Sequence, residues 1–541
     1  MNRRDALCGV IIAGAAVCAR AYEIHTLTSP HSQTDGFYGA SIASGEDVDH
    51  DGYADVVIGA YGEAHSSGTV SAGRAYVISG QSGQVLYTLE SPSPGWYGCF
   101  GLAVSFAGDF DGDGFADIVV GAPNEDNGVP DAGGAYLFGG RDGRLLGALR
   151  SPAPQFNGLF GWSVARAGDA NEDGYDDVIV GALQENGGAV LAGRAYVFGG
   201  PDGVLLLTLE LPSPQDYAGF GFSVDGGADV DGDGRDDLAV GAPGKLAGED
   251  DAGATYVFSG ADGAPLHTIP SPAPEFRGYF GIDVTFIDDV TADGCGDLIV
   301  GAKLEDGGTV DGGRAYVLSG ADGALVHTLE SPNCRYWGYF GYSVAGTDDL
   351  NGDGCRDVLV GAFGEHIGET SCGRAYTFSG RDGSLLHTLT SPDQQDLGRF
   401  GWAVSGAGKV NDDPWEDVVV GAWSEDGDAQ NSGRVYVVTP SVILDVQVAS
   451  SVELRWLPHS GAAAYWVYGT PNDPYFSPGL TPPFQDRLAA LPASSLAWDT
   501  SVGQADPGAN WVFLVVAIDD SAQEMSRSNR VAEWDVDMAI P

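Results

Sequence analysis

An internal repeat of 60 residues is the feature that most constrains what this chain can fold into. Phe-Gly recurs at this spacing, and Tyr38-Gly39 stands 62 residues before the first copy: Phe100, Phe160, Phe220, Phe280, Phe340 and Phe400. Gly-Ala recurs in step with it: Gly59, Gly121, Gly181, Gly241, Gly301, Gly361 and Gly421. The 83 glycines of the 541-residue chain are therefore periodic and do not signal low complexity. The chain contains seven copies of one structural unit.

Each copy reads as four short strands. In residues 220–269 the segments FGFSV, LAVGA, ATYVFSG and APLHTI have strand composition, and Asp262-Gly263 forms a hairpin turn before the last of them. The second segment is continuously apolar, which is typical of a strand buried on both faces. Four antiparallel strands per repeat indicate a β-propeller, whereas a solenoid would need fewer strands per unit.

The two ends of the repeat region predict how the ring closes. The seventh copy stops after its third strand, and the segment YEIHTLTSP (22–30) matches LLHTLTSP, which ends at Pro392. We therefore predict that Glu23 to Leu27 pairs into the last blade, because an unpaired edge strand is a liability for aggregation. The predicted fold is all-β: a seven-bladed β-propeller closed by an N-terminal strand, followed by a small β-sandwich.

Phe-Gly, an acidic loop and Gly-Ala-Pro recur in this order, with Gly-Ala-Pro intact at 121–123 and 241–243. This combination resembles the FG-GAP repeat of integrin α-subunit propellers and covers residues 22–440. The resemblance implies a calcium-binding propeller with a role in adhesion or recognition. The even spacing leaves no room for an inserted ligand-binding domain, and the integrin leg domains have no counterpart here. Pairing with an integrin β-subunit is therefore not implied.

The acidic loop joins the first two strands of each copy and has the pattern D-x-[D/N]-x-D-G-x-x-D. Oxygen atoms at positions 1, 3, 5 and 9 are the hard ligands that Ca²⁺ prefers, and the glycine at position 6 permits a sharp turn. Without a cation these carboxylates would repel one another. Five copies carry complete candidate ligand sets: Asp47, Asp49, Asp51 and Asp55; Asp109, Asp111, Asp113 and Asp117; Asp169, Asn171, Asp173 and Asp177; Asp229, Asp231, Asp233 and Asp237; Asp349, Asn351, Asp353 and Asp357.

Two copies depart from this pattern. The fifth loses one carboxylate and offers Asp289, Thr291, Asp293 and Asp297, whereas the seventh has Lys409 at position 1 and Pro414 at position 6. We expect no metal in the seventh copy and five or six calcium ions per chain. An EF-hand is excluded because it requires glutamate at position 12. In every copy here, position 12 is an apolar residue inside the second strand. Magnesium is disfavoured because it retains its waters.

The N-terminus and the charge bear on location and partners. Residues 1–21 combine Arg3 and Arg4, an apolar stretch and the site Ala19-Arg20-Ala21, the pattern of a signal peptide. No later apolar run is long enough to span a bilayer. A net charge of −51 argues against nucleic acid or an anionic membrane surface as a partner. We expect a secreted or cell-surface protein.

Five cysteines remain beyond the leader: Cys99, Cys295, Cys334, Cys355 and Cys372. None has CxxC spacing, which disfavours zinc and thiol-redox sites. An odd number leaves at least one thiol unpaired or intermolecular. Cys334 and Cys372 lie in loops of the same repeat and are the candidate disulfide.

The period ends near residue 440. Residues 441–541 contain VELRWLP, AAYWVYG, WVFLVVAIDDSA and SNRVAEW, which read as strands of a β-sandwich similar to a fibronectin type III module. Trp456 would occupy the core position of an early strand. Trp511 stands where such modules usually carry a tyrosine, a departure from the pattern.

Other recurrent side chains leave alternatives open. Glu125, Glu185, Glu305, Glu365 and Glu425 recur with an arginine that opens the third strand, and these form either ion pairs or a substrate-binding ring. Histidines recur on the fourth strand (His25, His267, His327 and His387) without metal spacing. Trp96, Tyr97, Tyr336 and Trp337 lie on variable loops and serve either recognition of a protein or carbohydrate or packing between blades.

The sequence therefore favours an adhesion or recognition module for an extracellular protein or carbohydrate, with no catalytic residues and with structural calcium. An extracellular enzyme that acts on polysaccharide or lipid at the propeller face is an alternative. A structural component of the envelope is another.

Overall fold

The computed structural model describes residues 19–367, 370–410 and 417–448, together with six strands between 452 and 536. These residues divide into two compact units: one is Thr26–Val437, and the other combines the described residues up to His25 with those from Val438 onward. Every regular element among them is a β-strand. No apolar helix long enough to cross a bilayer occurs in this part of the chain.

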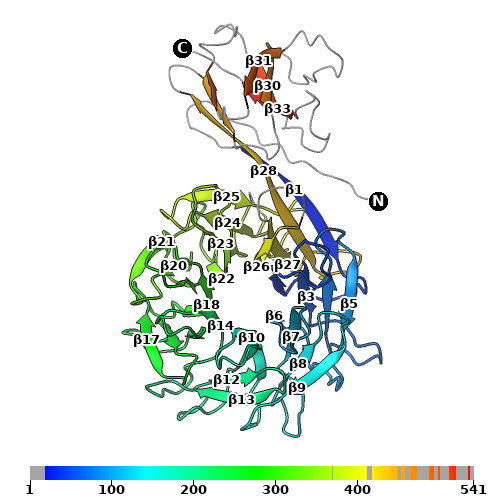
Figure 1. Cartoon of the computed structure of the whole chain (residues 1–541), viewed down its shortest axis with the longest axis vertical. Coiled ribbons are helices and arrows are strands. Elements are labelled where there is room, and N and C mark those ends of the chain that lie inside the picture. Colours follow the sequence, from blue (N-terminus) through cyan, green and yellow to red (C-terminus); the bar gives the residue numbers. More distant parts are fainter. Residues whose placement is uncertain are drawn as a thin grey trace. The chain divides into compact units, whose positions relative to one another are not determined.

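The first unit is a seven-bladed β-propeller, as predicted (Figure 1). Blade one contains β2 (Ser41–Ser44), β3 (Val56–Ala60), β4 (Arg74–Ile78) and β5 (Val85–Leu89). Blade two contains β6 (Ala103–Gly108), β7 (Asp117–Ala122), β8 (Gly134–Phe138) and β9 (Leu145–Leu149). Blade three contains β10 (Phe160–Gly168), β11 (Asp177–Ala182), β12 (Arg194–Gly199) and β13 (Val204–Leu209). All pairings within these blades are antiparallel.

The remaining blades repeat the same order. Blade four contains β14 (Val224–Ala228), β15 (Asp237–Ala242), β16 (Ala254–Phe258) and β17 (Pro265–Pro270). Blade five contains β18 (Phe280–Ile287), β19 (Asp297–Ala302), β20 (Arg314–Leu318) and β21 (Leu325–Leu329). Blade six contains β22 (Phe340–Thr347), β23 (Asp357–Ala362), β24 (Arg374–Phe378) and β25 (Leu385–Leu389). The first strand of each blade lies nearest the axis and the fourth lies outermost, as the labels in Figure 1 show.

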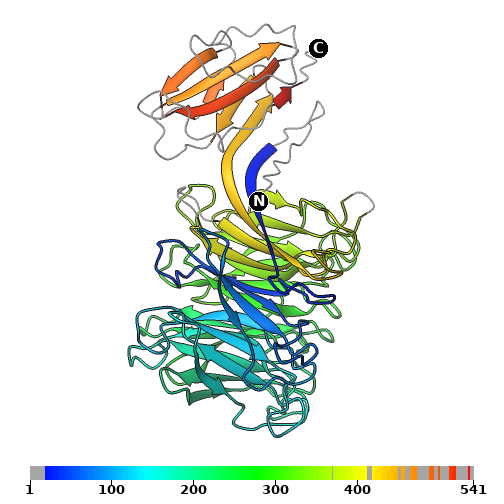
Figure 2. The ribbon, with the colours of Figure 1, turned by 90° about the vertical axis from the view of Figure 1, so that its right-hand side faces the viewer.

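The N-terminal strand closes the ring as the sequence predicts. Blade seven contains β26 (Phe400–Gly408), β27 (Asp417–Ala422) and β28 (Arg434–Val448), and β1 (Ala19–Thr28) pairs with β28 as the fourth strand. Figure 2 shows β1 in blue beside β28 in yellow. A parallel bridge between Tyr38 and Gly433 joins blades one and seven, in the same way that Phe100 meets Gly73 between blades one and two. Residues 1–18 lie outside the described residues, so the signal peptide stays a prediction.

Close backbone contact between blades explains why both glycines recur. A Cβ atom on Gly121 would lie 2.0 Å from the carbonyl oxygen of Gly161, which belongs to the Phe-Gly pair of the next blade. Gly161 has a φ of +87°, a conformation that L side chains rarely adopt. The Gly-Ala of one blade and the Phe-Gly of the next are therefore two halves of one interblade contact.

The core lies between the blades. The second strand is buried along its whole length in all seven blades, as predicted, and the third strand is almost as buried. The phenylalanine of Phe-Gly is fully buried in blades two to seven and packs edge-on against the third strand; the Phe100 and Phe138 ring centroids lie 6.0 Å apart at 87°. Burial of one such ring stabilises the fold by about 1.5–3 kcal/mol, so each blade is anchored to its own hairpin.

The C-terminal unit also contains paired strands. One sheet has the order β31 (Arg487–Pro492), β30 (Ala464–Pro471), β33 (Trp511–Ile518) and β34 (Trp534–Val536). β29 (Val452–Trp456) pairs with β28 and with β32 (Ala497–Asp499). The side chains of this unit, including that of Trp456, lie outside the described residues. The assignment to a fibronectin type III module therefore stays a prediction.

The predicted disulfide between Cys334 and Cys372 is wrong, because both are free thiols. The loop that leads into a blade packs against the preceding blade, whereas the prediction paired two loops of one repeat. The Cys334 Sγ accordingly lies 3.0 Å from where a Cβ on Gly312 would stand, and Gly312 precedes Cys372 by one repeat. Cys99, Cys295 and Cys355 are also free.

Candidate functional site

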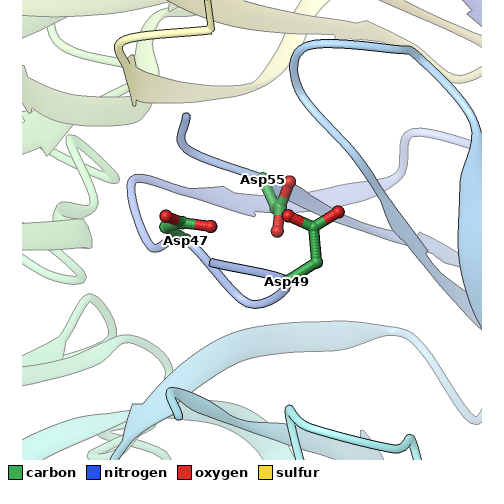
Figure 3. A group of neighbouring side chains, drawn as sticks. All are labelled: Asp47, Asp49 and Asp55. Carbon is green, nitrogen blue, oxygen red and sulfur yellow. The ribbon is translucent and has the colours of Figure 1, made fainter. Parts of the chain in front are cut away.

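The acidic loops connect the first and second strands, so they all lie on one face of the propeller. In blade one, Asp47 and Asp49 come from the loop after β2, and Asp55 immediately precedes β3. Figure 3 shows their three carboxylates gathered around this loop. One oxygen from each lies within 4.8 Å of the others. Blades two and four form the same cluster, with Asp109, Asp111 and Asp117 and with Asp229, Asp231 and Asp237.

Hydrogen bonds within the loop place the carboxylates at positions 1 and 5. The Asp47 Oδ2 accepts a hydrogen bond from the Gly52 amide (2.8 Å), and the Asp51 Oδ1 accepts one from the Tyr53 amide (2.9 Å). Position 5 therefore caps the turn and does not belong to the three-carboxylate cluster. The same bonds recur at Asp113, Asp173, Asp233, Asp293 and Asp353.

The aspartate at position 9 has a structural role that the sequence analysis did not recognise. Asp55 is fully buried, and its carboxylate accepts hydrogen bonds from the Val48 amide (2.8 Å) and from the Gly80 amide after the third strand (3.0 Å). Asp417 of blade seven keeps the bond to the amide at position 2, Val410 (3.1 Å), although Lys409 replaces the first ligand there. Position 9 is thus required for the blade itself. Its free lone pairs remain available to a cation.

The electrostatics of the loops favour a bound cation. Burial, together with Asp111 and Asp113 nearby, raises the pKa of Asp117 to about 7 despite two hydrogen bonds from backbone amides. The Asp109 Oδ1 and the Asn171 Oδ1 are buried and accept no hydrogen bond. An unsatisfied buried oxygen acceptor costs about 1–3 kcal/mol, a cost that a hard cation would remove. The residues present therefore fit calcium.

The other copies differ in detail. Asn replaces the second acid in blades three and six, and the Asn351 Nδ2 donates to Asp357 (3.2 Å). In blade five, the Thr291 hydroxyl donates to Asp289 (3.2 Å). Residues 411–416 of blade seven lie outside the described residues. In blade two, Arg144 forms an ion pair with Asp111 (2.9 Å), so a cation at this site competes with a guanidinium.

The recurrent glutamates form a buried network and do not form a substrate-binding ring. Glu125 is 1% exposed and accepts hydrogen bonds from the Tyr136 hydroxyl of its own blade and from the Ser91 hydroxyl of the preceding blade. The predicted ion pairs with arginine are confirmed in four blades, for example Arg374 with Glu365 at 3.2 Å. The serine and tyrosine partners were missed, although both recur in the sequence. Six interblade junctions carry this network: Glu63, Glu125, Glu185, Glu305, Glu365 and Glu425.

Blade four replaces three of the four side chains of this network. Leu211 stands in place of the serine, Lys245 in place of the glutamate and Ala254 in place of the arginine. The Lys245 ammonium donates to the Ser213 carbonyl (2.8 Å), and Leu211 is buried in an apolar cluster between blades three and four. The serine, the glutamate and the arginine are thus replaced together in blade four, whereas the tyrosine remains as the buried Tyr256.

The opposite face carries exposed aromatic side chains. Trp96 is 74% exposed and Trp337 is 53% exposed, so the alternative that these residues pack between blades is wrong. Further exposed aromatic residues come from the equivalent loops of other blades. We call the set the aromatic rim: Trp96, Tyr97, Phe156, Tyr217, Phe276, Tyr336 and Trp337. Aromatic side chains are enriched at binding surfaces, and an exposed patch of this kind in a soluble protein usually marks an interaction site.

Backbone strain coincides with the aromatic rim. Tyr97, Tyr217 and Trp337 adopt φ angles of 56°, 60° and 60°. The same position has a positive φ in every repeat, and its other residues are Asp35, Asn157, Arg277 and Leu397, of which only the first two are types that tolerate this conformation. A bulky residue in the left-handed region costs about 1–3 kcal/mol, and such strain concentrates at functional sites.

Comparisons with known proteins agree with this architecture. The FG-GAP repeat profile matches five blades, over residues 38–78, 100–138, 160–198, 220–258 and 340–378. The two blades outside these matches, five and seven, are those whose acidic loops lack a ligand. Similar proteins include integrin alpha-5 of Xenopus laevis, which is 32% identical over 238 residues, or 41% of this chain and 21% of that protein. Integrin alpha-IIb of Homo sapiens is 35% identical over 222 residues, which cover 39% of this chain and 20% of that protein. The chain thus spans about a fifth of the length of the relatives it matches.

Proposed function

We propose that this chain is an exported, calcium-stabilised propeller that acts as an adhesion or recognition module. The aromatic rim is the observation that carries the proposal, because it combines exposure with a strained backbone on the face opposite the acidic loops. The similarity to integrin α-subunits supports a role for the propeller in binding and not in catalysis. The partner is an extracellular protein or carbohydrate.

Calcium serves the scaffold in this proposal. The ligands come from positions 1, 3, 5 and 9 of each loop, with one oxygen of position 5 also holding the turn, and five or six ions bind per chain. A bound cation neutralises carboxylates that otherwise repel one another and connects the first strand of a blade to its second. The acidic loops lie on the face opposite the aromatic rim, so calcium supports the binding face without contacting the ligand.

The proposal assigns a role to each segment of the chain. Residues 1–21 direct export, residues 22–440 form the propeller, and residues 441–541 form a fibronectin type III-like sandwich. The strand order supports this sandwich, since β28, β29 and β32 form one group and β31, β30, β33 and β34 form another, as expected for two facing sheets.

A binding screen tests this proposal. The full chain, with calcium, is applied to panels of extracellular matrix proteins and of glycans, and hits are measured again with Trp96→Ala/Trp337→Ala. We expect the double variant to lose about tenfold or more in affinity, because aromatic anchors dominate interfaces. Leu145→Ala/Val204→Ala removes exposed apolar side chains from outer strands and serves as the matched control. Equal loss in both double variants, or turnover of a polysaccharide in place of binding, would contradict the proposal.

A further inference from the structure

A second group of aromatic residues lies on the same face, nearer the axis than the aromatic rim. Its members directly follow the second strand of a blade, belong to the start of the first strand or, for Tyr279, directly precede the first strand; Figure 1 places the first strands next to the axis. We call it the axial aromatic cluster: Tyr61, Tyr279, Tyr342, Phe363, Trp402 and Trp423. The Tyr342 and Trp402 ring centroids lie 4.5 Å apart, and those of Trp402 and Trp423 lie 4.8 Å apart. Ring contacts thus join blades six, seven and one, and the Lys303 ammonium links Tyr279 at blade five to them.

Two cations contact this cluster without a counter-ion. The Lys303 ammonium lies 5.6 Å from the Tyr279 ring centroid and 5.0 Å from that of Tyr342. The Arg399 guanidinium lies 5.2 Å from the Phe363 ring centroid. Within the described residues, neither side chain has a carboxylate at ion-pair distance or a hydrogen-bond acceptor. This is unexpected in a chain with 76 acidic and 25 basic residues.

A third donor in the cluster is also unsatisfied. The Trp423 Nε1 is buried and donates to no acceptor. Lys303 is half-buried, and burial lowers its pKa to about 8. An indole N–H has no acceptor capacity, and neither a protonated lysine nor an arginine has any, so all three groups require acceptors. The indole N–H is the buried one of the three, and an unsatisfied buried donor costs about 1–3 kcal/mol, which a ligand rich in acceptor oxygens would recover.

The combination of flat aromatic rings with unpaired donors defines the class of ligand. A sugar presents an apolar C–H face that packs on aromatic rings and edges of hydroxyl and ring oxygens that accept hydrogen bonds. A carboxylate on that sugar pairs with Lys303 and Arg399. An acidic peptide would also bring backbone N–H donors, and the three unsatisfied groups include no acceptor for them. A polyanionic glycan would be repelled by the net charge of −51.

We propose that the axial aromatic cluster, with Lys303 and Arg399, binds a carboxylated sugar residue within an otherwise neutral glycan. This inference rests on the proposed recognition function and names its ligand class. The rings of Tyr342 and Trp402 stack on sugar faces, and the two cations hold the carboxylate. The aromatic rim outside the cluster then contacts neighbouring neutral residues of the glycan.

Paired probes test the carboxylate directly. Cellobiuronic acid is compared with cellobiose, and sialyllactose with lactose, by isothermal titration and by tryptophan fluorescence of the full chain with calcium. We expect at least one acidic sugar to bind about tenfold or more tightly than its neutral partner, as a charge-assisted hydrogen bond allows. Lys303→Met and Arg399→Met should each reduce that affinity to the neutral level. Arg277→Met removes a cation over a ring (Phe276) on the same face outside the cluster and should have no effect.

The outcomes separate this inference from the proposed function. Lys303→Met keeps the aliphatic stem and removes a cation without a counter-ion, so the variant should fold, and Lys303→Arg should retain binding. Equal affinity for acidic and neutral sugars, or equal loss in Arg277→Met, overturns the carboxylate site. Binding of N-acetyl-Gly-Glu-Gly-amide in place of both acidic sugars would assign the site to an acidic peptide. If Trp96→Ala/Trp337→Ala still abolishes binding in the screen while Lys303→Met does not, the proposed function stands and this inference fails.

Discussion

At the scale of single residues, the aromatic rim combines exposure with an unfavourable backbone. Tyr97 is 61% exposed with a φ of 56°, and Trp96 beside it is 74% exposed without a positive φ. Folding stability alone would place asparagine, aspartate or glycine at position 97, as blades three and one do. Arg277 and Leu397 adopt the same conformation at this position, so the strain belongs to the repeat, and the exposed aromatic ring is what distinguishes Tyr97, Tyr217 and Trp337.

Tyr97→Asn should raise the free energy of unfolding by about 1 kcal/mol, because asparagine adopts the left-handed conformation with less strain. Trp96→Asn is the control, since it removes an equally exposed ring without relieving strain. Both stabilities are measured by urea unfolding in calcium. A Tyr97→Asn variant that is no more stable than Trp96→Asn would contradict the assignment of strain.

The buried Glu305 should make the free energy of unfolding depend on pH. Burial raises the pKa of Glu305 to about 7, although the Ser271 and Tyr316 hydroxyls and Arg314 oppose the shift. An unfolded glutamate has a pKa of about 4.3. The folded chain therefore binds this proton more tightly, and the associated stability is complete below about pH 4 and is lost as pH rises through about 7.

Glu305→Gln should therefore change the free energy of unfolding differently at the two ends of this range. Between pH 4.5 and 7.5, the free energy of unfolding of the natural chain should fall by on the order of 2 kcal/mol relative to that of the variant, because glutamine has no proton to release. Urea unfolding at both pH values measures the difference, and subtraction cancels groups that titrate in both proteins. Glu330→Gln removes an exposed carboxylate that pairs with the same arginine and should show no such change. A difference that does not vary with pH would contradict the buried-carboxyl account.

At the scale of elements, each acidic loop carries more carboxylates than the turn between its two strands requires. The carboxylates at positions 5 and 9 accept the hydrogen bonds that form the turn. The carboxylates at positions 1 and 3 have oxygens that converge on one point. In the proposed function, the ring of loops is a set of separate cation sites, one for each competent blade. Each site should contribute to stability by mass action.

Asp231→Ala should lower the melting temperature in calcium and reduce the further decrease that EDTA causes. A site filled at a hundred times its Kd contributes about 2.7 kcal/mol, which a variant without the site cannot gain. Asp142→Ala removes an exposed carboxylate from a hairpin turn on the same face and should leave both values unchanged. Metal analysis should return five or six calcium ions for the natural chain and one fewer for Asp231→Ala. An unchanged melting curve in EDTA, or seven ions per chain, would contradict this account.

At the scale of the whole molecule, closure of the ring depends on two contacts between distant parts of the chain. β1 completes blade seven beside β28, and Tyr38 meets Gly433. Leu27 from β1 packs against the apolar cluster between blades seven and one. Without these contacts, blade seven would present an open strand edge.

Deletion of residues 19–27 should lower the melting temperature and produce concentration-dependent oligomers, since the exposed edge of β28 can pair with another chain. Leu27→Asp, which keeps the strand and disrupts only its apolar contact, should have a smaller effect on stability and none on oligomeric state. Size-exclusion chromatography with light scattering distinguishes the two variants. A monomeric deletion variant with an unchanged melting temperature would show that β1 does not close the ring.

The sequence alone determined the number of blades, the four strands of each, the acidic loops and the closing strand. All of these follow from a 60-residue period and from local composition, which act within one repeat. The tertiary structure decided whatever depends on contacts between repeats. It placed Cys334 beside Gly312 and away from Cys372, joined Ser91 to Glu125 across a blade junction, and left Trp96 exposed. It also gathered Lys303 of blade five with Arg399 and Trp423 of blade seven around the axial aromatic cluster. The physical reason is that a ring brings together residues one or more repeats apart, and no local pattern specifies which faces of neighbouring repeats meet.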